Sequence, residues 1–254
     1  MLIGNNDLTV APLTWPATYS WHRGVVNFTE NPRQNVDISV DLWGKAGTPA
    51  TIVDAAHNLL DPNHGVMLKD MASPVMAVCY SFGPQKEAPS FMGGMVVFKY
   101  TSEAAMARRF LTCGTVDRQW QGIKGRKGLM PDPVGAMVKA QISRLRDTRN
   151  KRTRLLKEYH RCLGDWLFTK PNECSAHLCV WEAQSKAHRD KVRKRLNSQR
   201  VAWGHHYPVP DCVRGYYRDL SDTVITLPLH MGMTVNDVRD ICKCVLSVEP
   251  PDLQ

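Results

Sequence analysis

The chain has 254 residues, of which 43% are hydrophobic, so it is long enough to bury a sizeable core as one or two domains. No stretch reaches the roughly 18 consecutive apolar residues that a membrane-spanning helix requires. The first residues do not resemble a signal peptide. We therefore expect a cytoplasmic protein that neither spans a membrane nor is secreted.

The positive charge is concentrated in one stretch. The formal net charge is +9, and residues 108–161 alone hold 15 Lys/Arg against four Asp/Glu. A field of this sign attracts polyanions, either nucleic acid or phosphate-rich small molecules. A solvated helix face that aids solubility gives the same pattern. The candidate nucleic-acid contacts are Arg118, Lys124, Arg126, Lys127, Arg149 and Arg152.

The eight cysteines are spread along the chain, which is typical of reduced thiols rather than of a disulfide scaffold in a protein of this length. Several cysteines and histidines fall between residues 174 and 212. Their spacing matches no common zinc pattern, and His177 and Cys179 alternate as strand residues do. We therefore expect no metal and interpret these side chains as ordinary core and surface residues.

In chain order, the first predicted elements are short strands. Residues 8–12 predict a strand, and residues 25–41 predict strand fragments and turns. Two apolar runs follow, at 51–53 and 75–80. Each run indicates a short buried strand that is stopped by a polar residue and a turn.

Polar residues with distinct chemistry follow these two buried strands. Asp54 and His57 come after the first strand, and Ser81 and Lys86 come after the second. In open α/β sheets the ligand crevice lies off the carboxyl ends of the strands, so these four side chains are expected to converge there. An acid, a lysine and a hydroxyl in one crevice suit pyridoxal phosphate, because they can pair with the pyridine nitrogen, form a Schiff base and hold the phosphate.

The elements after Lys86 begin with a turn at Gly93-Gly94, where glycine permits close backbone approach before a strand over 95–98. A helix over 103–111 is expected, capped by Ser102. The Gly-rich, basic residues 112–133 indicate a surface loop or lid.

A partial apolar stripe predicts one long helix over 133–163, interrupted near its start. From residue 165 onward the pattern indicates a small α+β domain. Its expected elements are a strand over 176–181, a basic helix over 185–197, and a final helix opened by Thr234 with Asp237 in a near capping box.

Several of these motifs occur together in one known family. The chain carries Asp54-Ala-Ala-His57, then Ser81-Phe-x-x-x-Lys86, then Gly93-Gly94, and later His206-Tyr-Pro-x-Pro210 and Leu227-Pro-x-His230. In this order the motifs resemble the DegT/StrS group of pyridoxal-phosphate enzymes, best known as sugar aminotransferases. The family's leading helices and its Gly-Thr phosphate turn have no counterpart before Leu8, so we expect an N-terminally shortened member.

The resemblance implies an α/β fold of the aspartate-aminotransferase-like type, called fold type I. Residues 1–164 would form the cofactor-binding large domain, with a central, mostly parallel sheet and a long linking helix at its end. Residues 165–254 would form the small C-terminal α+β domain. The resemblance also implies a homodimer, because the family builds its site between two subunits.

The resemblance further implies a role for each site residue. Lys86 would form the Schiff base with pyridoxal phosphate and later move the proton at the substrate's α-carbon, while Asp54 would pair with the pyridine nitrogen. His57 falls near the cofactor in the family, and Ser81 would hold the phosphate. The ring of Trp15 would stack on the pyridine ring. Lys127 falls where a family loop gives an Asn to the neighbouring subunit's phosphate.

The reaction stays open at this point. Breaking the C–H bond of an amine substrate gives transamination, and breaking the bond to a carboxyl group gives decarboxylation. The family default is amino transfer to a nucleotide-linked keto-sugar. The basic excess motivates an alternative, a phage-type enzyme that modifies amino-acid-bearing bases in DNA. A second alternative is a non-catalytic relic of the family that only binds polyanions.

Overall fold

A computed structural model describes residues 8–10, 26–28, 38–46, 50–208 and 216–249 of the chain. The described residues divide into two compact units. The first unit holds residues 8–10, 26–28, 38–40 and 50–144, and the second holds residues 41–46, 145–208 and 216–249. The domain boundary expected at residue 164 stays a prediction.

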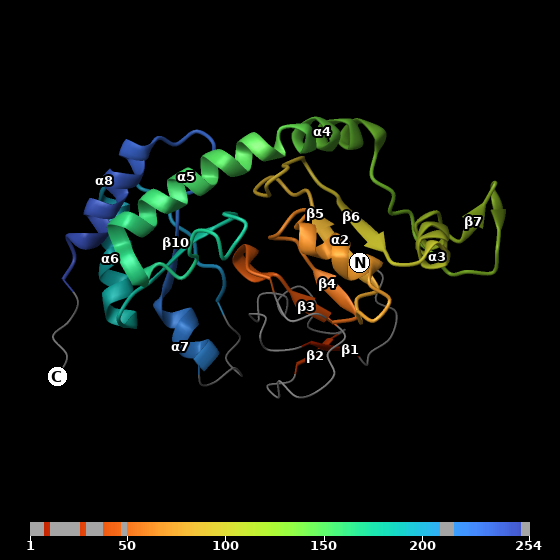
Figure 1. Cartoon of the computed structure of the whole chain (residues 1–254), viewed down its shortest axis with the longest axis horizontal. Coiled ribbons are helices and arrows are strands. Elements are labelled where there is room, and N and C mark those ends of the chain that lie inside the picture. The colour runs from red at the N-terminus through yellow and green to blue at the C-terminus, as the bar shows by residue number, and fades with distance from the viewer. Residues whose placement is uncertain (1–7, 11–25, 29–37, 47–49, 209–215, 250–254) are drawn as a thin grey trace. The chain divides into compact units, whose positions relative to one another are not determined.

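The first unit is built on a six-stranded sheet (Figure 1). Its strand order is β2-β1-β3-β4-β5-β6, and every neighbouring pair is parallel except β5 with β6. A central, mostly parallel sheet is therefore confirmed. The strands are β1 (Leu8–Val10), β2 (Val26–Phe28), β3 (Ile38–Val40), β4 (Ile52–Asp54), β5 (Ala77–Ser81) and β6 (Gly94–Phe98).

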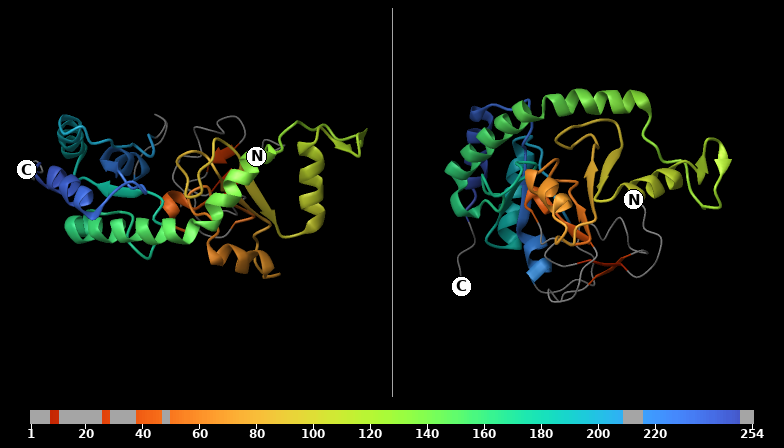
Figure 2. Two further views of the ribbon diagram at one scale, coloured as in Figure 1. Left: turned by 90° about the horizontal axis from the view of Figure 1, so that it is seen from above. Right: turned by 45° about the vertical axis from the view of Figure 1, so that its right-hand side comes forward.

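One face of the central strands is covered by helix α2 (Pro62–Lys69) (Figure 2). The helix begins after Asp61, whose side chain accepts a hydrogen bond from the backbone N–H of Asn63 at 2.9 Å. His64 of this helix is 1% exposed, and its Nδ1 lies 3.1 Å from the hydroxyl of Tyr80 on β5. This contact fixes which face of β5 is turned toward α2.

The turn before β6 depends on glycine, as the sequence indicates. Gly93 has φ of +109°, a conformation that L side chains rarely adopt. At Gly94 an added Cβ would lie 2.6 Å from the carbonyl oxygen of Tyr80 on the neighbouring strand. Close backbone approach at this edge of the sheet is therefore confirmed.

Helix α3 (Thr101–Leu111) follows β6 and leads into a hairpin of β7 (Thr115–Val116) and β8 (Gln119–Trp120). The prediction that Ser102 caps this helix is wrong, because the helix already begins at Thr101 and no side chain caps it. The hairpin lies within residues 112–133, for which the sequence predicts a surface loop or lid, and it projects from the end of α3 (Figure 1).

The helix predicted over 133–163 is interrupted, as the sequence indicates, but the interruption lies at Arg144 rather than near the start. Helix α4 (Asp132–Ser143) ends at Arg144, and α5 (Leu145–Leu163) begins directly after it. The N–H of Arg144 donates to the carbonyls of Gln141 and Ile142, which tightens the last turn of α4 and interrupts the helical ladder.

The second unit is organised around two antiparallel strands, β9 (Cys179–Glu182) and β10 (Val224–Leu227). Consecutive residues of both strands are buried, and neighbouring residues of a strand point to opposite sides. The pair is therefore buried on both faces. Trp181 and Ile225 face a core that also holds residues of α5, α6 (Lys186–Ser198) and α8 (Val235–Leu246). Val180 and Val224 face Trp43 of the 3-10 turn η2 (Leu42–Gly44) and Leu220 of α7 (Tyr216–Thr223).

The helices of this unit begin where the sequence indicates. The hydroxyl of Ser185 accepts from the N–H of His188 at 3.1 Å and caps α6. Thr234 and Asp237 form a full capping box at the start of α8. The short turn η3 (Gly164–Trp166) follows α5. Among the described residues, no helix has the length and apolar character needed to cross a membrane.

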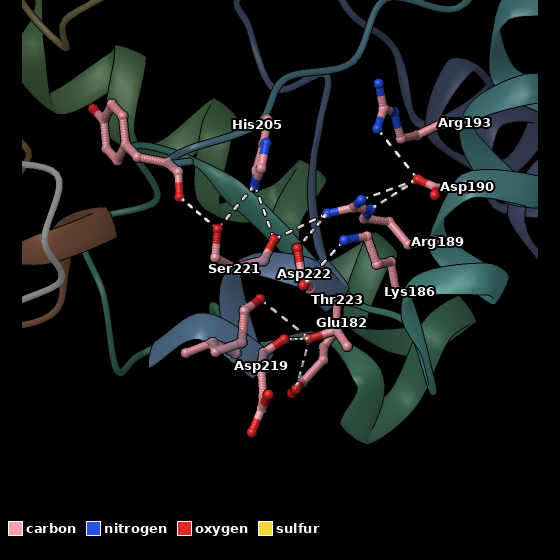
Figure 3. Close-up of polar contacts among 12 residues, drawn as sticks. Glu182, Lys186, Arg189, Asp190, Arg193, His205, Asp219, Ser221, Asp222 and Thr223 are labelled. Carbon is pink, nitrogen blue, oxygen red and sulfur yellow. Dashed lines mark hydrogen bonds and ion pairs between the residues drawn. The ribbon is translucent and has the colours of Figure 1, made fainter. Parts of the chain in front are cut away.

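A polar network joins α6 to α7 inside the second unit (Figure 3). The carbonyl of Ser221 accepts from Nε2 of His205 at 2.8 Å and from Nη1 of Arg189 at 3.1 Å. Nε2 of His205 therefore carries a hydrogen. Burial lowers the pKa of His205, and the nearby Arg189 and Arg193 lower it further, against the bond to Ser221 and the charge of Asp222, which raise it.

We expect that replacing Gly94 with alanine destabilises the first unit, because the new methyl group would overlap the Tyr80 carbonyl. Overpacking of this kind costs about 1–3 kcal/mol. The control is Gly65→Ala in α2, where no atom lies within 4 Å of the added Cβ. That change should stabilise the helix by up to about 1 kcal/mol. Urea unfolding of the two variants measures both effects, and equal stabilities would contradict the close approach.

We also expect His205 to make the stability of the protein fall in mild acid. Its pKa is lower in the folded than in the unfolded chain, so the unfolded chain takes up the proton first. Titration of His205 then leaves the stability unaffected above the unfolded pKa near 6.5. The stability is lost as the pH falls from there to the lower pKa of His205 in the folded chain. His205→Gln should reduce this slope in urea unfolding between pH 5 and pH 7.5; an unaltered slope would contradict the assignment.

Candidate active site

The candidate site lies at the carboxyl ends of β4 and β5 in the first unit. These strands pair in parallel, with Asp54 opposite Cys79, and Ser81 lies two residues further along β5. Residues in register across a parallel pair point to the same face, as do residues two apart on one strand. Asp54, Cys79 and Ser81 therefore share one face and are half-buried, whereas Tyr80 points to the opposite, buried face.

Asp54 is held by the turn that follows its strand. Its Oδ1 accepts a hydrogen bond from the N–H of Ala56 at 3.0 Å, and the N–H of Ala55 donates to the carbonyl of Cys79 at 2.8 Å. The first bond fixes the carboxylate and the second fixes the backbone, so the turn itself orients the side chain.

Lys86 lies on the loop that connects β5 to β6, and this loop is closed at its base. The N–H of Phe82 donates to the carbonyl of Gly93 at 2.9 Å. The hydroxyl of Ser90 lies 2.8 Å from the carbonyl of Phe82 and 2.6 Å from that of Met92. Phe82 itself is 1% exposed. The loop is therefore anchored at both ends and does not depend on the lysine.

Lys86 and Ser81 lie on either side of the same small volume. A Cβ built on Gly83 would lie 3.8 Å from Cγ of Lys86 and 3.8 Å from Oγ of Ser81. The N–H of Lys86 donates to the carbonyl of Gly83 at 3.0 Å, which curls the loop back toward the end of β5. The structure thus brings together the hydroxyl and the lysine that the sequence indicates.

Lys86 and Asp54 also interact electrostatically. Burial lowers the pKa of the Lys86 amine to about 8, while the negative charge of Asp54 opposes this shift. Desolvation prevails, so the amine is about half neutral at pH 8, against less than about 1% for an ordinary lysine. The neutral amine is the form that attacks an aldehyde.

Two other lysines near this region lack these properties. The amine of Lys99 donates to the carbonyls of Asp70 and Ser73, both at 2.8 Å, and Lys69 is exposed at the end of α2. The amine of Lys99 is therefore held by backbone carbonyls, and the side chain of Lys69 is exposed to solvent. Lys86 is therefore the best candidate nucleophile among them.

Two residues of the site were missed by the sequence reasoning. Cys79 lies beside Asp54, and its pKa is raised to about 12 by burial and by that carboxylate, so the thiol stays neutral. Its position opposite Asp54 follows from the strand register. Glu87 is 3% exposed and accepts a hydrogen bond from the N–H of Leu59 at 3.0 Å. The only sequence signal for it is an acid directly after the lysine.

The other predicted site residues fall in different places. His57 is buried in the turn that continues from Asp54, which keeps it close to the site. Trp15 lies outside the described residues. Lys127 is exposed, and its backbone pairs with Thr112 at the end of α3, so it lies outside the group formed by Asp54, Ser81 and Lys86.

The candidate nucleic-acid contacts differ in how exposed their side chains are. Arg118, Lys124, Arg126 and Lys127 are exposed on and after the β7–β8 hairpin, whereas Arg149 on α5 is half-buried. Arg152 is 8% exposed, and its Nη2 donates to the carbonyl of Leu229 at 3.1 Å inside the second unit. Nucleic-acid binding by these residues stays a prediction.

The group of side chains around Lys86 fits pyridoxal phosphate. The cofactor needs an amine for its aldehyde, an anion for its ring nitrogen and donors for its phosphate. Asp54 and Ser81 supply the anion and a donor from one face of the sheet, and Lys86 supplies the amine from the loop after β5. A sequence model of the DegT/DnrJ/EryC1/StrS aminotransferase family matches residues 48–246. The chain belongs to this family.

Solved structures of several other proteins share the fold. DesI, crystallised in the presence of its TDP-sugar product, is 18% identical with a TM-score of 0.76 over 95% of this chain and 74% of its own. PseC from Helicobacter pylori, an aminotransferase of pseudaminic acid biosynthesis, is 17% identical with a TM-score of 0.76 over 97% of this chain and 80% of its own. The pyridoxal-phosphate form of the putative sugar aminotransferase Spr1654 from Streptococcus pneumoniae is 17% identical with a TM-score of 0.72 over 96% of this chain and 81% of its own.

A search of curated proteins finds no match. Membership of the DegT/DnrJ/EryC1/StrS family nevertheless sets the class of the protein, which is a pyridoxal-phosphate-dependent aminotransferase of fold type I. The roles of individual residues do not follow from this membership.

We expect that Asp54→Asn lowers the pKa of Lys86 below 8, because it removes the charge that favours the ammonium form. The pH dependence of Lys86 acetylation, followed by peptide mass spectrometry, measures this pKa directly. The control is Asp117→Asn on the exposed hairpin, which should leave it unchanged. A rise, or no change, in the Asp54 variant would contradict the interaction.

Proposed function

We propose that the protein transfers an amino group between an amine or amino-acid donor and a nucleotide-linked keto-sugar, with Lys86 as the residue that holds pyridoxal phosphate. The observation that carries the proposal is the half-buried amine of Lys86 within electrostatic reach of Asp54, at the ends of two adjacent parallel strands. Ligand crevices of open α/β sheets lie at such strand ends.

The side chains of this chain would have separate tasks. The carboxylate of Asp54 would hold a proton on the pyridine nitrogen, and its bond to the N–H of Ala56 keeps it oriented for this. The hydroxyl of Ser81 would donate to the phosphate, and His57 would lie against the cofactor from the turn after β4. When bound, pyridoxal phosphate supplies the electron sink that stabilises negative charge at the substrate's α-carbon.

Lys86 would both hold the cofactor and move protons. A pKa of about 8 keeps a large share of the amine neutral at working pH, so the group can accept a proton at the substrate's α-carbon and return it. The backbone N–H of Lys86 donates to the carbonyl of Gly83, and this turn would keep the lysine facing the end of β5 during proton transfer.

The substrate part of the proposal is supported by the neighbours and by the charge of the chain. DesI was crystallised with a TDP-sugar product, and PseC is described as an enzyme of pseudaminic acid biosynthesis. The basic residues exposed around the hairpin would attract the diphosphate of such a substrate. Transamination is favoured over decarboxylation because the family is one of aminotransferases.

We further propose that the protein acts as a homodimer in the cytoplasm. The first unit exposes large apolar side chains that a partner subunit would cover, among them Phe91 at 74% and Trp120 at 67% exposure. Lys127, close to Trp120 in the chain, would then contribute to the partner's phosphate site.

The described cysteines are free thiols, which suits a reducing compartment. Action on bases in DNA and a cofactor-free relic have no support from the comparisons.

We expect the purified protein to turn yellow with pyridoxal phosphate and to be fixed as a covalent adduct by borohydride. Peptide mass spectrometry should locate the adduct on Lys86. Lys86→Ala should abolish it, because no other described lysine near the site combines burial with a reachable acid. The control is Lys69→Ala, which removes an exposed lysine and should leave the adduct intact.

An adduct on another lysine would contradict the assignment of Lys86, and the absence of any adduct would favour the relic. With the adduct present, amino transfer to a nucleotide-linked keto-sugar should be detected by mass spectrometry of the product. Release of carbon dioxide from the donor without amino transfer would instead favour decarboxylation.

A further inference from the structure

Glu87 follows Lys86 directly in the chain, yet its side chain is removed from solvent. It is 3% exposed, and Oε2 accepts a hydrogen bond from the backbone N–H of Leu59 at 3.0 Å. Leu59 is also 3% exposed and belongs to the turn that continues from Asp54. The bond therefore connects the loop after β5 to the turn after β4.

Burial of a carboxylate is costly, and it is tolerated when hydrogen bonds satisfy the group. A bond from a backbone N–H to a carboxylate is charge-assisted and stronger than a neutral one. At 3% exposure the Glu87 side chain has almost no contact with water. The carboxylate provides a connection between two loops.

This connection acts on the two reactive groups. Lys86 and Glu87 are consecutive, so their Cα atoms are about 3.8 Å apart, and fixing one carboxylate restricts the lysine backbone. The other partner, Asp54, is fixed by its bond to Ala56. Both members of the Lys86–Asp54 pair are thus attached to the same short turn, residues 54–59.

We propose that Glu87 is a positioning residue that holds the Lys86 loop against the Asp54 turn through its bond to Leu59, and so keeps the lysine amine desolvated and within electrostatic reach of Asp54. The inference rests on the proposed function in treating Lys86 as the reactive lysine. Asp54 and the neutral thiol of Cys79 lie on the open face of the strands, whereas the carboxylate of Glu87 is directed to Leu59. Glu87 acts on Lys86 through geometry.

Three variants separate geometry from charge. Glu87→Gln keeps the length and an oxygen acceptor but removes the charge. Glu87→Asp keeps the charge but withdraws the oxygen from Leu59 by one methylene. Glu87→Ala removes both and serves where the Asp variant is unstable. The control is Ser90→Ala, which loosens the base of the same loop and leaves Glu87 in place.

The readout is the pKa of Lys86 in protein without pyridoxal phosphate, from the pH dependence of its acetylation. Glu87→Asp and Glu87→Ala should raise this pKa from about 8 toward 10.5. A rise of about one unit lowers the neutral share of the amine at pH 8 about fivefold. Glu87→Gln and Ser90→Ala should leave the pKa unchanged.

An unchanged Lys86 pKa in folded Glu87→Asp and Glu87→Ala proteins overturns the proposal. A shift in Glu87→Gln as large as in Glu87→Asp also overturns it, because the charge and not the hydrogen bond would then matter. A shift in Ser90→Ala as large as in Glu87→Asp does the same, because general loosening of the loop would explain it. Failure of pyridoxal phosphate to bind Lys86 contradicts only the proposed function, since the titration needs no cofactor.

Discussion

The parallel pairing of β4 with β5 is the constraint on which the candidate site depends. It sets Asp54 opposite Cys79 and leaves Ser81 two residues beyond, on the same half-open face. A slip of this register by one residue would turn Ser81 toward the face that α2 covers, because side chains alternate along a strand. The burial of Tyr80 against His64 of α2 opposes such a slip.

The electrostatics of the site follow from this arrangement. Removal from water disfavours the charged form of Lys86, and the carboxylate of Asp54 restores part of the loss. The outcome is an amine that is reactive near neutral pH, while the thiol of Cys79 stays protonated under the same influences. Burial disfavours the charged form of both groups. For the lysine the neutral form is the nucleophile, whereas for the cysteine the neutral thiol is the unreactive form.

The second unit is stabilised in a different way. Its two strands are buried on both faces by helices and by Trp43, and the carbonyl of Ser221 on α7 accepts hydrogen bonds from Arg189 of α6 and from His205. Similarity to the solved aminotransferases at 17–18% identity shows that the fold is retained while most side chains differ. A fold can persist at such identity because the pattern of buried positions, rather than particular residues, determines the packing.

The sequence by itself determined the family, the buried strands that end in Asp54 and Ser81, the glycine turn before β6 and the capping box of α8, because these depend on local patterns of two to six residues. It did not determine that the helical interruption lies at Arg144, that a hairpin follows α3, or where α3 begins, because the alternatives differ little in local energy. Only the tertiary structure placed Cys79 beside Asp54 and linked Glu87 to Leu59. Such contacts join residues about 25 or more positions apart, and no local pattern encodes which of them meet once the strands pair.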